Sequence, residues 1–135
     1  MSIIQCASVE TPYHSNNPIE LRKNIAYAIL CAKHTTRVYN EAPYVSHLIH
    51  TQTISDQGSI EYVSDSYIDK FGVGRDKTLE ITNVLRKKCD KFVFYMDRGS
   101  SYGMKQAHDL AIKNNIPYEY RNLSDEELLL LDKVI

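Results

Sequence analysis

The chain has 135 residues, of which 43% are hydrophobic and 24% are charged, with a formal net charge of -1 and a pI near 6.5. This length suits one ordinary globular core and is short for two, so we expect a single domain over residues 1–135. The nearly balanced charge gives no whole-molecule attraction to nucleic acid or to an anionic membrane, which argues against polynucleotide and membrane partners.

The sequence has no apolar run long enough to cross a bilayer, and its first residues lack the features of a signal peptide. We therefore expect a cytoplasmic protein. Three cysteines, Cys6, Cys31 and Cys89, are widely spaced and embedded in apolar segments. An odd number at such spacing favours small core residues in a reducing compartment over a disulfide framework or a zinc site, and a catalytic thiol remains a minor alternative.

The amino-terminal part of the chain predicts a strand followed by a helix. Ile3 to Ser8 is short and mostly apolar, as expected of the first and central strand of a doubly wound sheet. Asn17 and Pro18, with Glu20 three residues after Asn17, are typical of a helix start. Apolar residues at helical spacing then predict a helix that runs to about Lys33.

A second strand is expected after this helix, at Arg37–Tyr39 or at Glu41–Val45. Pro43 favours a strand end or an edge strand, because proline cannot donate to a sheet ladder. Ser46 is then a candidate cap for a short helix.

Two histidines, His47 and His50, are three positions apart and would be neighbours on the surface of that short helix. This spacing can bind a metal, but catalytic metals need three protein ligands and no third ligand is evident nearby. We therefore predict no metal and interpret the histidines as polar groups near a pocket.

Residues 53–75 are rich in glycine, serine and aspartate, and they predict either a flap over a ligand or a surface insertion. After this segment, Asp76 is a candidate cap for a helix that ends at about Lys88. The apolar residues of that helix, which we expect to face inward, are Ile81, Val84 and Leu85.

The segment from Phe92 to Ala111 contains a strand, a polar turn and a helix. Phe92 to Met96 is apolar without interruption, which is typical of a strand buried on both faces of a parallel sheet. Helical spacing then begins at about Ser101. The turn between them is rich in Ser and Gly and precedes a helix amino end, so it could receive a phosphate or carboxylate; alternatively, its serine only caps the helix.

The remaining elements complete an alternation of strands and helices, with a strand at Ile116–Tyr120 and a final helix that begins near Ser124. Such alternation predicts a mainly parallel sheet with helices on both faces. Ligands bind such sheets at the carboxyl ends of strands where the strand order reverses. If the first strand and the Phe92 strand are neighbours, the loops after them meet there. The candidate ligand-binding residues are Ser8, Tyr13, His14, His47, Asp97, Ser100, Ser101, Gly103 and Met104.

Four segments carry a resemblance to known proteins: ASVETPYHSNN, NIAYAILCAK, EAPYVSHLIHTQ and YMDRGSSYGMKQAHDLAIKNNIPYEYRNL. They resemble a largely phage-borne family of small domains of unknown function. More distantly, the chain is similar to nucleoside 2-deoxyribosyltransferases and deoxynucleoside 5'-monophosphate N-glycosidases, whose pattern is matched by Asp90, Asp97, Ser101 and Gly103. The resemblance implies a flavodoxin-like or Rossmann-like three-layer sandwich with a four- or five-stranded, mainly parallel sheet. It also implies a nucleotide site in which the serine and glycine receive a 5'-phosphate, without a cofactor.

The chain departs from those enzymes at Ala107, where they carry a catalytic glutamate six residues after the serine. Alanine can form neither a glycosyl-enzyme intermediate nor a hydrogen bond to a sugar hydroxyl. Asp97 could act instead as nucleophile or sugar ligand, or it could only brace the turn.

These observations lead us to expect a nucleoside or nucleotide binding protein without glycosidase activity, acting in phage nucleotide metabolism or host interaction. The alternative is an N-glycosidase or deoxyribosyltransferase that uses Asp97 as its key acid. A third possibility is a structural protein that assembles as a homo-oligomer through the helix containing Leu128–Leu131, because four consecutive leucines cannot all face one core.

Overall fold

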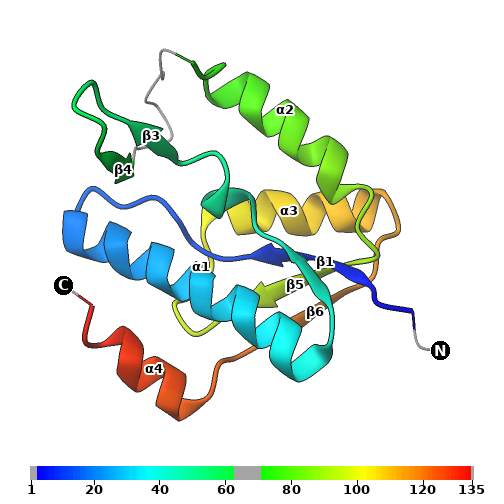
Figure 1. Cartoon of the computed structure of the whole chain (residues 1–135). Coiled ribbons are helices and arrows are strands. Elements are labelled where there is room, and N and C mark those ends of the chain that lie inside the picture. The colour runs from blue at the N-terminus through cyan, green and yellow to red at the C-terminus, as the bar shows by residue number, and fades with distance from the viewer. Residues whose placement is uncertain (1–2, 63–70, 135) are drawn as a thin grey trace.

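The computed structural model describes residues 3–62 and 71–134, and its centre is a four-stranded parallel sheet in the order β2-β1-β5-β6 (Figure 1). Its strands are β1 (Cys6–Glu10), β2 (Ala42–Tyr44), β5 (Lys91–Tyr95) and β6 (Tyr118–Arg121). Two further strands, β3 (Gln52–Ile54) and β4 (Ile60–Tyr62), form a separate antiparallel hairpin. The sheet confirms the predicted α/β, flavodoxin-like arrangement, with four parallel strands.

Helices cover both faces of this sheet, which gives three layers. They are α1 (Pro18–Tyr39), α2 (Arg75–Arg86), α3 (Tyr102–Lys113) and α4 (Asp125–Leu131), with a short 3-10 helix η1 at Ser46–Leu48. The long α1 and the terminal α4 lie side by side on one face, and α3 packs on the other (Figure 1). None of the helices in the described ranges is both long enough and apolar enough to pass through a membrane.

The central strand β5 divides its side chains between the two faces. Val93 and Tyr95 pack into the core beneath α1, whereas Phe92 and Phe94 pack against α3. All four are at most 2% exposed, as predicted for a strand covered on both sides. On the neighbouring strand β1, Glu10 is paired with Phe94 in the parallel register, so its side chain lies on the α3 face of the sheet.

The strand order reverses between β1 and β5, since the chain passes from β1 to β2 on one side and from β5 to β6 on the other. The two strands are neighbours, which is the condition under which the loops after them were expected to meet. Their carboxyl ends, at Glu10 and Tyr95, therefore define the edge of the sheet at which ligands bind in this class of fold.

The first helix is longer than predicted, and it includes Arg37–Tyr39, so the prediction of a strand there is wrong. The alternative at Glu41–Val45 is confirmed, because β2 lies within it at an edge of the sheet. The helix continues because Thr35 is fully buried and its hydroxyl is 2.9 Å from the Tyr95 hydroxyl. It ends at Asn40, whose left-handed conformation has φ 53°.

The segment predicted as a flap or insertion begins with the β3–β4 hairpin, and residues 63–70 of it lie outside the described residues. Just before the hairpin, Ser46 is the first residue of η1 and not its cap. Val45 holds the cap position and makes no side-chain capping bond.

Helix α2 turns a different face to the sheet from the one predicted. Its apolar residues Ile81, Val84 and Leu85 are 42–52% exposed. The buried residues are Thr82 and Arg86. The guanidinium of Arg86 is 2.8 Å from the carboxylate of Glu10 on β1. Because this buried ion pair faces the sheet, the three apolar residues of α2 lie at the surface. The helix begins after Gly74, which has φ 81°, so Asp76 lies in its first turn and is not its cap.

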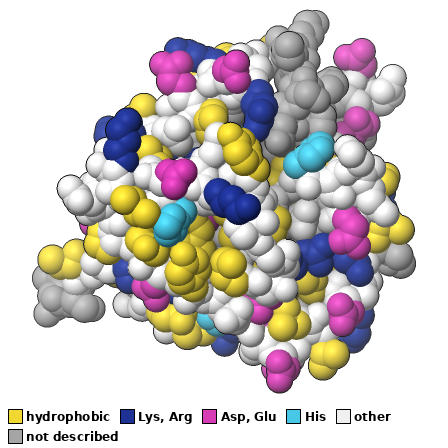
Figure 2. All heavy atoms as spheres, turned by 180° about the vertical axis from the view of Figure 1, so that it is seen from behind, with side chains coloured by type: hydrophobic (Ala, Val, Ile, Leu, Met, Phe, Trp, Pro, Cys, Tyr) yellow, Lys and Arg dark blue, Asp and Glu magenta, His cyan; other side chains and the backbone are white. Residues whose placement is uncertain are grey.

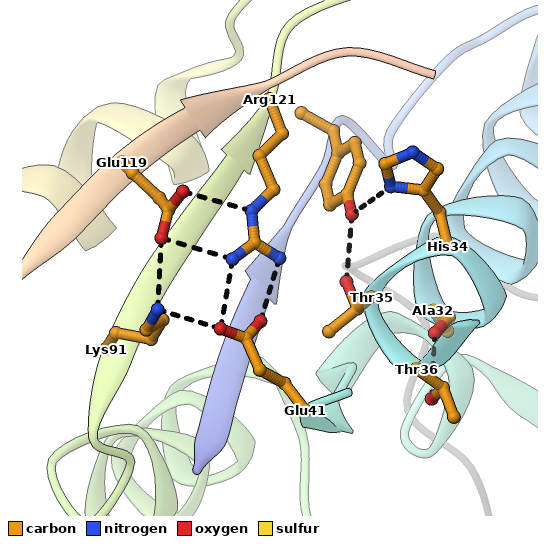
Figure 3. A network of polar contacts seen from close by, with 9 residues as sticks. Ala32, His34, Thr35, Thr36, Glu41, Lys91, Glu119 and Arg121 are labelled. Atoms are coloured by element: carbon orange, nitrogen blue, oxygen red, sulfur yellow. Dashed lines mark hydrogen bonds and ion pairs between the residues drawn. The ribbon is translucent and has the colours of Figure 1, made fainter. Parts of the chain in front are cut away.

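A second charge cluster, centred on the buried side chains of Arg121 and Glu41, lies on the α1 face of the sheet (Figure 3). Arg121 makes two contacts with Glu41, at 2.8 and 3.1 Å, and its guanidinium lies 3.5 Å from the ring centre of Tyr39. Lys91 bridges Glu41 and Glu119 at 2.7 and 3.1 Å. Two cations and two carboxylates balance one another here, so the cluster joins β6, β5 and the start of β2 and leaves no charge for a ligand.

Candidate functional site

The turn between β5 and α3 is built as the sequence indicates, with Ser101 at the helix cap. The Ser101 hydroxyl accepts a hydrogen bond from the Met104 amide at 3.2 Å, which satisfies one of the free donors of the first helical turn. Gly99 has φ 82°, a conformation that side chains disfavour, and its amide donates to the Met96 carbonyl at 3.0 Å. The Ser and Gly residues therefore form the cap and the turn, and Ser100 remains exposed beside them.

Asp97 connects three segments of the fold. Its Oδ2 accepts hydrogen bonds from the Tyr27 hydroxyl at 2.7 Å and from the Leu123 amide at 3.0 Å. Its own amide donates to the Tyr27 oxygen at 3.0 Å. Burial, together with neighbouring Cys31 and Asp97, raises the pKa of Tyr27, so the hydroxyl keeps the proton that it donates. These contacts are those of a brace between β5, α1 and the segment after β6.

The next residue, Arg98, fastens the turn to α1. Its Nε donates to the Asn24 side-chain oxygen at 2.9 Å, and its Nη2 pairs with Glu20. The Asn24 amide nitrogen in turn donates to the Tyr13 carbonyl at 2.9 Å. Thus the loops after β1 and β5 do meet, as expected, and Asn24 and Arg98 form the connection between them.

Three of the candidate residues from β1, the loop after it and η1 make contacts within the protein. Tyr13 is 4% exposed and stacks on His47, with ring centres 5.2 Å apart. His47 Nε2 donates to the Thr11 carbonyl at 3.0 Å. Ser8 is 1% exposed and its hydroxyl donates to Glu10 at 2.9 Å. Only His14 of this group lies exposed.

A hollow of about 380 Å³ lies between α3 and the carboxyl ends of β5 and β6. This volume is within the range of small-ligand sites. Its lining combines two aromatic rings, an imidazole, an ammonium, a carboxylate and a hydroxyl: Phe94, Met96, Ser100, Met104, Lys105, His108, Asp109 and Tyr120. Figure 2 shows the face of the molecule that is hidden in Figure 1, where hydrophobic side chains gather beside a histidine and a basic side chain.

The floor and one wall of the hollow are aromatic. Phe94 lies 5.7 Å from Tyr120 and 6.0 Å from His108, measured between ring centres. His108 meets Tyr118 at 4.7 Å with the rings at 71°, an edge-to-face arrangement that holds the imidazole in place. Tyr120 is 57% exposed, so its ring remains available to a planar ligand.

A second hollow, of about 210 Å³, lies between α2 and α3. It is lined by Leu79, Asn83, Arg86, Gln106, Asp109, Leu110 and Lys113. It is the smaller of the two, and its one buried cation, Arg86, is already paired with Glu10. In the described part of the chain, no group of three or more His, Cys, Asp or Glu side chains is placed to hold a metal ion.

Of the candidate residues, Ser100 and Met104 line the larger hollow, and Ser101 and Gly103 flank them at the start of α3. Asp97, Tyr13, His47 and Ser8 do not line it. Sequence reasoning missed Lys105, His108 and Tyr120. His108 is four positions after Met104 and so shares its helix face, and Tyr120 is two positions after Tyr118 and so shares its side of the strand. The sequence does not show that this helix and this strand are in contact.

The position that would carry the catalytic glutamate of the resembled enzymes is also defined. Ala107 is 1% exposed and packs with Phe92, Phe94 and Ala111 beneath α3. Its side chain therefore belongs to the core, and a carboxylate at this place would be buried among apolar groups.

The sequence family described as "Domain of unknown function (DUF7768)" matches residues 5–121, and the chain belongs to this family. The matched range includes the whole sheet, the β5–α3 turn and Tyr120, and it ends before α4. No curated protein and no solved structure matches the chain.

Proposed function

We propose that this chain binds a nucleoside 5'-monophosphate in the hollow between α3 and β6, and that it does not cleave the glycosidic bond. The observation that carries the proposal is the combination of an exposed tyrosine ring with an ammonium at the start of a helix. Tyr120 and Lys105 both line the hollow, and Ser100 lies beside them. A nucleotide unites the two complementary features, a planar base and an anion.

The base is assigned to the aromatic side of the hollow. Stacking on a tyrosine is worth about 1–3 kcal/mol per base and tolerates any base, since every base has an aromatic face. The fixed imidazole of His108 and the carboxylate of Asp109 add hydrogen-bonding groups at the same wall. They are suited to polar edges of the base or to a sugar hydroxyl.

The phosphate is assigned to the amino end of α3. The amides of Tyr102 and Gly103 belong to the first helical turn, which lacks intrahelical acceptors, and the helix dipole favours an anion there. Lys105, four residues after the cap residue Ser101, adds a positive charge close to these amides. The space beside the Gly103 α-carbon is open, because a Cβ added there would have only the Ser101 hydroxyl within 4 Å, at 3.9 Å.

The absence of glycosidase activity is proposed from the two acids that could serve as nucleophile. The buried Ala107 stands where the resembled enzymes carry their catalytic glutamate, and the Oδ2 of Asp97 already accepts two hydrogen bonds away from the hollow. Relationship to the deoxyribosyltransferase-like proteins, a phage origin and a role in nucleotide metabolism are parts of this proposal that rest on the sequence resemblance alone.

Titration calorimetry with nucleoside 5'-monophosphates, the matching nucleosides and inorganic phosphate tests the assignment. We expect the monophosphates to bind most tightly. Lys105→Gln should weaken the monophosphate about tenfold and leave the nucleoside unchanged, because it removes one charge-assisted contact. Tyr120→Leu should weaken both by about tenfold or more, because it removes the stacking surface.

Two further variants complete the test, the first as a matched control and the second as a probe of the phosphate position. Lys113→Gln removes a lysine of the same helix, about 12 Å along its axis from Lys105, and should leave affinity unchanged. Gly103→Ala should leave the fold at least as stable, since alanine favours a helix more than glycine does, yet it should weaken the monophosphate by crowding the phosphate. Absence of binding by every monophosphate, or release of free base by the wild-type protein, would contradict the proposal.

Self-association through α4 remains a separate proposal, supported by the division of its leucines between two environments. Leu131 is 4% exposed and Leu128 packs against the core, whereas Leu129 and Leu130 are 64% and 54% exposed. A second copy of the chain could cover the exposed pair. Light scattering that detects only monomer at high protein concentration would remove this proposal.

A further inference from the structure

Two thiols that are far apart in the sequence lie in contact at the amino ends of β1 and β5. The Sγ atoms of Cys6 and Cys89 are 3.3 Å apart, although the residues are separated by 83 positions. Both cysteines are free thiols. The backbone holds them there, because the Asp90 amide donates to the Cys6 carbonyl at 2.8 Å and the Cys6 amide donates to the Asp90 carboxylate at 2.7 Å.

We propose that Cys6 and Cys89 are a redox-active pair that forms a reversible disulfide when the protein meets a low-molecular-weight disulfide such as oxidised glutathione. A disulfide has an S–S bond of about 2.05 Å, so the two sulfurs need to approach by about 1.3 Å. Rotation of the two side chains is the smallest movement that supplies this. The third thiol, Cys31, is fully buried on the inner face of α1, in the same core cluster as Tyr27 and Ala28, and it takes no part.

The two thiols differ in exposure, and this difference indicates which of them reacts first with oxidised glutathione. Cys6 is partly exposed, whereas Cys89 is 8% exposed and its burial raises its pKa to about 12. The Cys6 thiolate attacks one sulfur of oxidised glutathione, and the first glutathione leaves as a thiolate. Cys89 then loses its proton and attacks the Cys6 sulfur, and the second glutathione leaves. The protein loses two electrons and two protons, and glutathione disulfide is reduced to two thiols.

The bond would tie the first strand to the junction of α2 and β5. It closes a loop that contains β1, α1, β2 and α2, and constraint of so long a loop in the unfolded chain stabilises the fold. The thiols lie at the opposite end of the strands from the hollow lined by Ser100 and Tyr120. Oxidation is therefore expected to change stability without changing ligand affinity, and it is independent of the proposed function.

The test starts from the full reduced chain, which is incubated with oxidised glutathione under native conditions and then denatured in an alkylating agent. We expect the wild-type protein to lose about 2 Da and to retain one alkylatable thiol of its three. Peptide mapping should link the peptide containing Cys6 to the one containing Cys89 and find Cys31 alkylated. The oxidised protein should melt several degrees above the reduced protein.

Two variants and one condition complete the design. Cys6→Ser and Cys89→Ala should each abolish the cross-link, and the same oxidation in denaturant should give mixed pairings, since the native contact is then lost. The proposal is overturned by a stable glutathione adduct on Cys6 without a cross-link, by a cross-link that includes Cys31, or by no reaction of the native chain. It is equally overturned if oxidation lowers the melting temperature, because the bond would then not fit the native fold.

Discussion

The buried ion pair between Glu10 and Arg86 makes the strongest prediction about stability. Their charged groups are 2.8 Å apart, and the two side chains are 2% and 8% exposed. Removing one partner leaves the other charge buried, which costs about 3–5 kcal/mol. For a chain of this length we therefore expect Arg86→Met or Glu10→Leu alone to lower the melting temperature by about 10–18 °C.

Replacing both partners gives a different expectation, because no unpaired charge remains. The double variant loses two hydrogen bonds, from Ser8 to Glu10 and from Arg86 to Asn83, each worth about 1 kcal/mol, and gains apolar contacts. A double-mutant cycle by urea unfolding measures this coupling. The exposed pair Lys77–Glu80 on the same helix is the matched control, and Lys77→Met should change the free energy of unfolding by less than about 1 kcal/mol. Additive effects of the Glu10 and Arg86 substitutions would refute the reasoning.

Two further predictions concern single side chains. Burial lowers the pKa of His34, whose Nδ1 contacts the Tyr95 hydroxyl at 2.8 Å, so the unfolded chain takes up a proton below about pH 6.5 before the folded chain does. Urea unfolding should therefore show lower stability at about pH 5.5 than at about pH 7.5, with a smaller loss in His34→Gln, and an equal loss in the variant would count against this assignment. Asp97→Asn should cost about 2 kcal/mol by weakening the bonds from Tyr27 and Leu123, while calorimetry finds nucleotide affinity within about twofold; a larger loss of affinity would make Asp97 a ligand.

Local patterns in the sequence were sufficient for much of the fold. The uninterrupted apolar run from Phe92 predicted β5, and the onset of helical spacing at Ser101 predicted the cap of α3. Both depend on neighbouring residues, which a sequence displays directly. The extension of α1 through Arg37–Tyr39 was not predictable in this way, because Thr35 is held by Tyr95, 60 positions away.

The same limit explains the error in α2. Hydrophobic periodicity predicts that Ile81, Val84 and Leu85 face inward, but the residues that α2 buries are Thr82 and Arg86. A charged residue on a helix is normally read as solvent-facing, and only the position of Glu10 on the neighbouring strand makes its burial acceptable. Periodicity cannot reveal a partner 76 positions away.

Asp97 shows why some of the candidate binding residues differ from those predicted, although the turn lies where the sequence predicted it. A carboxylate beside a helix amino end is equally suited to ligating a sugar and to bracing a turn, and local sequence is the same for both. What separates the roles is the origin of its donors, Tyr27 on α1 and the Leu123 amide after β6. With Asp97 engaged by these donors, the groups that we propose as ligand contacts lie further along the chain: Lys105 and His108, about one and two helical turns after Ser101, and Tyr120 on the adjacent strand.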